Sequence, residues 1–198
     1  MLVSLQILEG RREMIKEDLR IPDMVVPHVL DIDFEELSRQ GRFYYIFDLD
    51  NTLARRDESL PQWPISVKIR HAQAAGWIGG IVIISNIAVD RKWLIVGQSR
   101  AARVRKSALL LDSGYIACTL PILKPHPRPF LQAMEIMNAR SDETVVIGDQ
   151  ISKDIVGGNR VGAFTILVEP LGPDMWLTAI LRYFKERKLR ARLSAQVR

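Results

Sequence analysis

The chain has 198 residues, of which 47% are hydrophobic and 26% are charged. This length and balance suit a single globular domain with a sizeable core, and they exclude a disordered or low-complexity chain. The net charge of +5 favours contact with an anionic partner, such as a phosphorylated substrate, a nucleic acid or an acidic membrane surface. The single cysteine, Cys118, excludes an internal disulfide and a cysteine-based zinc site.

The same composition predicts where the protein works. No apolar run reaches the roughly 18 residues of a membrane-spanning helix, and residues 1–9 lack the basic leader of a secretory signal. One cysteine indicates a reducing compartment. We therefore expect a cytoplasmic protein that makes peripheral contact with the inner face of a membrane, or the organellar equivalent.

The first part of the chain is predicted to be helical. A helix over residues 2–19 would end at Pro22, because proline stops a helix. An extended connector and a short acidic helix near residues 33–40 follow. We expect residues 1–26 to form an N-terminal helical extension and residues 27–198 to form the main domain.

The most informative stretch is the next one. Five bulky apolar residues, Phe43 to Phe47, run without a break into Asp48 and Asp50. Such a run is typical of a strand that is buried on both faces of a parallel sheet. Residues i and i+2 of an extended chain point the same way, so the two carboxylates can serve one site. The alternative is a solvated capping turn after an ordinary strand.

Three further apolar runs predict strands that alternate with helices. The strands are expected at residues 80–86, 144–149 and 163–168, and the helices at 66–75, at 90–104, from a proline-rich loop at 123–129 to about 138, and from 173 to about 193. This alternation predicts an α/β fold with a doubly wound parallel sheet and right-handed crossovers. Three of the strands end in polar residues at the same carboxyl edge, which favours a site there.

Four polar segments carry a resemblance to a known family. In chain order they are Asp48-Leu49-Asp50-Asn51-Thr52, Ser85-Asn86, Lys124-Pro125 and Gly148-Asp149-Gln150-Ile151-Ser152-Lys153-Asp154. They resemble the four ordered motifs of haloacid-dehalogenase (HAD) superfamily phosphatases, and more closely those of the YqeG family of that superfamily. The resemblance extends from about Pro27 through residues 154–160 to the basic C-terminal segment. It implies a HAD-like Rossmannoid fold.

The resemblance implies a phosphatase mechanism with two catalytic carboxylates. Asp48 would be the nucleophile that forms an aspartyl-phosphate intermediate, and Asp50 would be the general acid and then the base. A phosphate monoester carries nearly two negative charges, so a carboxylate needs a cation to approach it. Mg²⁺ is the expected cofactor, held by the side chains of Asp48 and Asp149. The resemblance adds the backbone carbonyl of Asp50 as a ligand.

The remaining motif residues are expected to bind phosphate or support the site. Lys124 would bind a phosphoryl oxygen, with the hydroxyl of Ser85 and the backbone of Asn86 donating beside it. Asp154 would orient Lys124 or complete the metal shell, and Thr52 would hold its loop. The alternatives are a surface lysine before a proline turn, a helix N-cap for Ser85 and a turn cap for Asp154.

The spacing between motifs bears on the substrate. The intervals 53–82 and 87–123 hold only core elements, so we expect no cap domain and an open site suited to phosphate carried on a large molecule. Basic residues gather in 90–106 and 182–198. The final helix is predicted to be basic and amphipathic, so that it packs either on the sheet or in an anionic membrane interface.

The predicted function follows from these points. Members of the resembled family include mitochondrial and plastid phosphatases of phosphatidylglycerophosphate, so the predicted reaction converts this anionic lipid to phosphatidylglycerol at a membrane surface. One alternative is a capless phosphatase of a soluble metabolite or phosphoprotein. A second is a non-enzymatic assembly factor, or a factor associated with RNA or the ribosome. DNA is not an expected partner, and the filled catalytic positions favour an enzyme.

Overall fold

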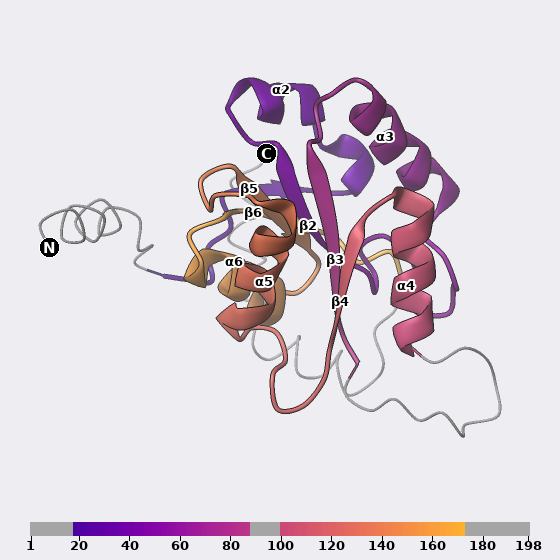
Figure 1. Ribbon diagram of the computed structural model, residues 1–198, viewed down its shortest axis with the longest axis vertical. Coiled ribbons are helices and arrows are strands. Elements are labelled where there is room, and N and C mark those ends of the chain that lie inside the picture. The colour runs from indigo at the N-terminus through magenta and orange to yellow at the C-terminus, as the bar shows by residue number, and fades with distance from the viewer. Residues whose placement is uncertain (1–17, 88–99, 173–198) are drawn as a thin grey trace, which may run out of the picture.

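The computed structural model describes residues 18–87 and 100–172. Within them, six strands form one parallel sheet in the order β1-β6-β5-β2-β3-β4 (Figure 1). The strands are β1 (Met24–Val26), β2 (Tyr44–Asp48), β3 (Gly80–Asn86), β4 (Gly114–Cys118), β5 (Thr144–Gly148) and β6 (Phe164–Val168). The helices are η2 (Val29–Asp31, 3-10), α2 (Phe34–Arg39), α3 (Trp63–Ala74), α4 (Arg100–Leu111), α5 (Pro127–Met137), η3 (Ile151–Ile155, a π-helical turn) and α6 (Val156–Arg160).

Helices cover both faces of the sheet. On β2, Tyr45 and Phe47 point to the face that packs against α2, α3 and α4, and Ile46 points to the face that packs against α5. All three side chains are buried, which explains why the strand reads as a continuous apolar run instead of an alternating one. Figure 1 shows the two groups of helices on either side of the strands. The predicted α/β doubly wound parallel sheet is therefore confirmed.

The strand order brings three predicted motifs to one edge. From β2 the chain passes to β3 and β4, and then returns to β5 on the other side of β2. This reversal beside β2 is the switch point at which open α/β sheets bind ligands. Asp48 pairs in register with Ile84, and Phe47 pairs with Ile147. The carboxyl ends of β2, β3 and β5 therefore lie next to one another.

Most predicted elements in the described residues are confirmed, with shifted ends. Strand β3 has the predicted bounds, and β2, β5 and β6 lie where expected. Helix α3 begins at Trp63, three residues before the predicted start, because Pro64 is tolerated in a first helical turn. It is followed by Gly76 with φ of +76°, in the left-handed region that favours glycine.

Three predicted helices lie partly or wholly outside the described residues. The helix expected at 90–104 is confirmed where it is described, at 100–104, and continues to Leu111. The helix expected at 173–193 lies outside the described residues. So does nearly all of the helix expected at 2–19, whose last residues lie in a bend and turn. Among the described residues, no helix is long and apolar enough to cross a bilayer.

The elements that the sequence patterns did not predict include β1 and α6. The connector before Pro27 contains β1, which pairs with β6 at the edge of the sheet. Helix α6 follows the last motif and packs closely on α5. Glycine at position 157 allows this approach, since a Cβ atom there would lie 2.2 Å from the ring of Phe130. The sequence patterns miss both elements because three residues are too few to identify a strand and five residues make little more than one helical turn. The division of the chain between residues 26 and 27 stays a prediction.

Candidate active site

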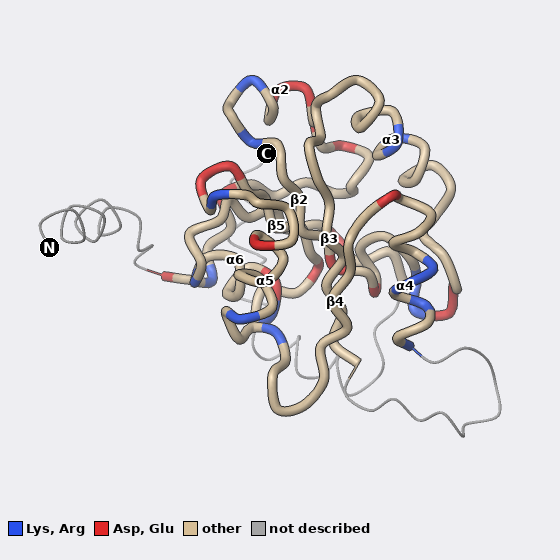
Figure 2. The backbone as a smooth tube through the Cα atoms, in the orientation of Figure 1, with Lys and Arg blue, Asp and Glu red and all other residues tan. Residues whose placement is uncertain are grey.

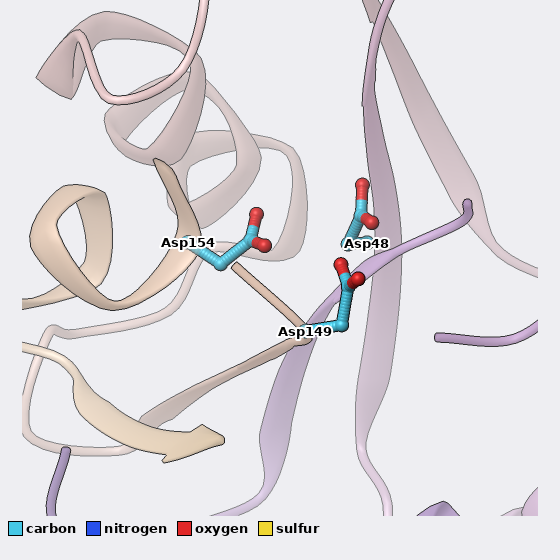
Figure 3. Close-up of side chains that lie close together, drawn as sticks. All are labelled: Asp48, Asp149 and Asp154. Carbon is cyan, nitrogen blue, oxygen red and sulfur yellow. The ribbon is translucent and has the colours of Figure 1, made fainter. Parts of the chain in front are cut away.

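Three carboxylates converge at the switch point. Asp48 is the last residue of β2, Asp149 follows β5 directly, and Asp154 lies in η3 (Figure 3). One carboxylate oxygen from each lies within 4.8 Å of the others. Their exposed fractions are 6%, 0% and 2%. Segments more than 100 residues apart in sequence thus build one buried acidic cluster.

Lys124 enters this cluster from the loop before α5. Its Nζ donates to Oδ1 of Asp48 at 2.5 Å, to Oδ1 of Asp154 at 2.7 Å and to the carbonyl of Ile84 at 3.1 Å. The side chain is only 3% exposed. All three ammonium donors therefore have acceptors, and Lys124 is a buried member of the site. The alternative of a surface lysine does not fit this burial.

The charges of the cluster do not balance. Three carboxylates face one ammonium group, so the cluster would carry two excess negative charges if all three carboxylates were ionised. Burial raises the pKa of Asp48 to about 8, against the opposing effect of Lys124 and with a further contribution from Asp154 and Asp149. Burial by itself would lower the pKa of Lys124, but the carboxylates of Asp154 and Asp48 raise it overall, so its ammonium stays charged.

Asn86 fixes the backbone of Lys124. The amide N–H of Lys124 donates to Oδ1 of Asn86 at 2.9 Å, and Nδ2 of Asn86 donates to the carbonyl of Lys124 at 3.2 Å. This reciprocal pair joins the end of β3 to the Lys124 loop. The side chain of Asn86 thus acts on Lys124, a role that the sequence analysis did not assign. Ser85, expected to donate to phosphate, is 2% exposed at the end of β3.

Asp154 reaches Lys124 because Gly148 leaves space for it. A Cβ on Gly148 would lie 2.3 Å from Cγ of Asp154, so no larger residue fits while Asp154 stays in place. The other oxygen of Asp154 accepts the amide N–H of Gln150 at 3.1 Å. These contacts support a role of Asp154 in orienting Lys124, which stays a prediction. The bond to Gln150 lies before Asp154 in the chain, whereas the capping alternative required a bond to the turn that follows Asp154.

Asp50 lies apart from the acidic cluster. Its carboxylate forms an ion pair with Nη1 of Arg103 on α4, and the two side chains are 18% and 14% exposed. In the sequence, Arg103 is one member of the basic segment at residues 90–106. No local signal could have singled it out, because the partner lies 53 residues earlier.

The turn after Asp50 is held mainly by backbone bonds. The carbonyl of Leu49 accepts from the amides of Leu53 and Ala54, each at 3.1 Å. Thr52, expected to support this loop, donates its backbone amide to Leu49 at 3.4 Å. The Thr52 hydroxyl is buried without a hydrogen-bond partner among the described residues. Support from Thr52 therefore comes from its backbone in this structure.

No cap domain interrupts the chain between β2 and β3. That interval is fully described and holds a loop and α3 alone. The four side chains of the cluster, Asp48, Lys124, Asp149 and Asp154, are nevertheless at most 6% exposed. The openness of the site to a large substrate stays a prediction.

The donor set fits a hard divalent cation. Mg²⁺ takes oxygen ligands, commonly one or two carboxylates, and the cluster supplies carboxylates with an excess of two negative charges. Both carboxylate oxygens of Asp154 already accept hydrogen bonds, one from Lys124 and one from Gln150. Asp48 and Asp149 are therefore the better side-chain ligands. Burial supports the same conclusion, because buried like charges are costly without a cation.

Comparisons with known proteins agree with the sequence resemblance. A family model described as HAD-hydrolase-like matches residues 122–170. The protein named "Probable phosphatase YqeG" of Bacillus subtilis (strain 168) is 29% identical over 177 residues, covering 86% of this chain and 90% of that protein. Phosphatidylglycerophosphate phosphatase 1, chloroplastic/mitochondrial, of Arabidopsis thaliana is also 29% identical, over 83% of this chain but 46% of that protein.

The fold has a solved counterpart. A crystal structure described as a HAD-like phosphatase from Mesorhizobium loti superposes with a TM-score of 0.50 at 19% identity. The match covers 77% of this chain and 78% of that chain. At this identity the likeness shows the fold alone. Together these matches confirm the resemblance to YqeG and to HAD phosphatases.

Proposed function

We propose that the protein is a Mg²⁺-dependent phosphatase that hydrolyses a phosphate monoester, with phosphatidylglycerophosphate as its substrate. The observation that carries the proposal is the contact of Lys124 with Asp48 at 2.5 Å inside a buried cluster that also holds Asp149 and Asp154. A nucleophilic carboxylate, a buried cation and surplus carboxylates for a metal are the groups that phosphoryl transfer needs.

The residues divide the reaction into two displacements. An oxygen of Asp48 attacks phosphorus and the bond from phosphorus to the ester oxygen breaks. Asp50, which has to be protonated at this stage, gives its proton to that oxygen. Water then attacks phosphorus of the aspartyl-phosphate, and Asp50 accepts a proton from the water. Phosphate leaves and the Asp48 carboxylate is restored. Each carboxylate thus ends the cycle as it began.

Lys124 has to exchange a partner during this cycle. Its three donors are occupied by Asp48, Asp154 and the carbonyl of Ile84. A phosphoryl oxygen would replace Oδ1 of Asp48 as an acceptor, which frees that oxygen for attack. Asp154 and Asn86 would keep the lysine in place meanwhile, one through its ammonium and the other through its backbone.

The metal would be held by Asp48, Asp149 and the backbone carbonyl of Asp50. When bound, Mg²⁺ neutralises the charge that keeps a carboxylate away from phosphate. The two excess negative charges of the cluster support a divalent ion. Phosphoryl-oxygen binding is assigned to Lys124, with Ser85 beside it at the end of β3.

The lipid substrate is supported by one relative and by charge. The relative of Arabidopsis thaliana is named for phosphatidylglycerophosphate, and it matches 83% of this chain. Acidic and basic residues are intermixed and nearly equal in number over the described residues (Figure 2). The positive excess of the chain therefore falls outside them, mainly in 173–198. We propose that this segment brings the protein to an anionic membrane surface.

Phosphate release in the presence of Mg²⁺ tests the reaction and the substrate together. Phosphatidylglycerophosphate in mixed micelles is compared with glycerol 3-phosphate, a nucleotide and a phosphopeptide. We expect the highest kcat/KM on the lipid and no turnover by Asp48→Asn. A preference for a soluble ester would favour a metabolite or phosphoprotein phosphatase instead. Full activity of Asp48→Asn would refute the nucleophile assignment.

Membrane contact has its own test. The full chain should sediment with vesicles that contain anionic lipid, and less so as salt rises, because salt screens the attraction. The variant Arg187→Glu/Lys188→Glu/Arg190→Glu should lose this binding while hydrolysing a soluble ester at the wild-type rate. Binding that does not respond to salt would contradict an electrostatic contact.

A further inference from the structure

Arg103 spans from α4 to the loop that follows β2. Its Nη1 donates to the carboxylate of Asp50, its Nε donates to the carbonyl of Glu58 at 2.6 Å, and its Nη2 donates to the carbonyl of Arg55 at 2.7 Å. The side chain is 14% exposed. Every nitrogen of the guanidinium thus has an acceptor, and all three acceptors lie between residues 50 and 58, in the loop that follows β2.

This arrangement sets the direction of the Asp50 side chain. The guanidinium is planar, and the two carbonyl contacts hold its plane in one orientation. The third nitrogen is then aimed at a fixed point, where it meets the Asp50 carboxylate. The backbone of Asp50 is already held by the turn in which Leu49 accepts from Leu53 and Ala54. The remaining freedom of Asp50 is rotation of its side chain, and the contact with Arg103 restricts that rotation.

The direction has a consequence for the reaction. Asp48, Asp149 and Asp154 cluster on one side, whereas Asp50 is turned toward α4. A proton donor must lie beside the ester oxygen that departs. If Asp50 gives that proton, the leaving group lies on the α4 side of Asp48. The bridge formed by Arg103 therefore determines where the organic part of the substrate can depart.

We propose that Arg103 is a positioning residue that orients Asp50 for proton transfer to the leaving-group oxygen. The inference rests on the proposed function, because it assigns Asp50 the role of general acid. A purely mechanical role, in which Arg103 only ties the loop to α4, is the competing explanation. The two differ in how they respond to the leaving group.

Leaving-group dependence separates these explanations. An aryl ester such as p-nitrophenyl phosphate departs as a stable phenolate and needs little proton donation, whereas glycerol 3-phosphate departs as an alkoxide and needs it. Both are measured as kcat/KM, which reports steps up to the departure of the leaving group. For Arg103→Ala we expect a loss of about 10²-fold on the alkyl ester, since general acid catalysis contributes about 10² to 10⁴. On the aryl ester the loss should stay below about fivefold.

Controls are available on the same helix and at Asp50. Arg105 lies exposed on α4, so Arg105→Ala removes a charge without touching the bridge, and both esters should react as with wild type. In an Asp50→Asn background, Arg103→Ala should cause no further loss on the alkyl ester, because the two residues act through one step. Arg103→Lys should recover little, since an ammonium cannot hold both carbonyls and the carboxylate in one plane.

The outcomes separate the inference from the function on which it rests. Equal losses on both esters, or an undiminished further loss in the Asp50→Asn background, would overturn the positioning role. If Asp48→Asn keeps full activity, the proposed function fails whatever Arg103 does. Thermal unfolding of each variant shows whether a loss merely reflects a protein that no longer folds.

Discussion

Replacing Asp149 by asparagine should stabilise the metal-free protein while removing its response to Mg²⁺. The Asp149 carboxylate has an oxygen within 4.8 Å of those of both Asp48 and Asp154. When all three carboxylates are ionised, which for Asp48 requires a pH above about 8, each such pair of like charges costs about 3.5 kcal/mol at an effective dielectric constant of 20. The ammonium of Lys124 offsets roughly one of the two pairs. Removing the charge should therefore raise the free energy of unfolding by about 1–3 kcal/mol.

Thermal unfolding with and without Mg²⁺ measures both effects. For a chain of this size, about 1 kcal/mol corresponds to about 2–4 °C in Tm, so metal-free Asp149→Asn should melt between roughly 2 and 12 °C higher than wild type. Addition of Mg²⁺ should raise the Tm of wild type but not that of the variant, because bound ligand stabilises only a protein that binds it.

A matched surface variant controls for loss of charge in general. Asp112 has a side chain that is 88% exposed and a φ of +50°, a conformation that asparagine also adopts readily. Asp112→Asn should leave both the Tm and the Mg²⁺ response unchanged. A metal-free Asp149→Asn protein that melts below wild type would refute the charge argument. An undiminished Mg²⁺ response would refute the assignment of Asp149 as a ligand.

Three further predictions follow from burial in and around the site. Burial raises the pKa of Asp48 from 3.8 to about 8, so the contribution of its proton to stability is fully present below pH 3.8 and is lost as pH rises to about 8. Because Mg²⁺ binds the ionised carboxylate, the Mg²⁺-induced rise in Tm should be larger at pH 8 than at pH 6. Gly148→Ala should lower the free energy of unfolding by about 1–3 kcal/mol and abolish turnover, because the new methyl group would displace Asp154; unchanged values in denaturant titration and phosphate release would contradict it. Burial raises the pKa of the Cys118 thiol to about 11 and leaves 4% of the residue exposed, so iodoacetamide at pH 8 should label folded protein far more slowly than unfolded protein, as mass spectrometry can test.

The fold could be read from the sequence because its signals are local and repeated. Each apolar run, such as residues 43–47, is long enough to identify a strand, and the helices between the runs imply parallel pairing. Strand β1 and helix α6 escaped because three residues are too few to identify a strand and five residues make little more than one helical turn. The predicted start of α3 was three residues too late because Trp63 and Pro64 were assigned to the preceding loop.

The candidate site could be predicted in position but not in its contacts. Asp48 and Asp149 were placed at one edge because parallel strands align their carboxyl ends. The reciprocal bonds between Asn86 and Lys124 could not be foreseen, since they depend on how the end of β3 and a loop 38 residues later approach each other. The pairing of Arg103 with Asp50 was missed for the same reason, and the helix charge pattern suggested a surface role instead.

The sequence by itself determined which residues stand at the ends of the strands, because apolar runs of five to seven residues must be buried and their first polar neighbours must then lie at the edge. Only the tertiary structure decided which of those side chains touch. The partners of Lys124 lie 76 and 30 residues away, and that of Arg103 lies 53 residues away. Such contacts are set by how the helices pack on both faces of the sheet, and no local pattern in the chain encodes that packing.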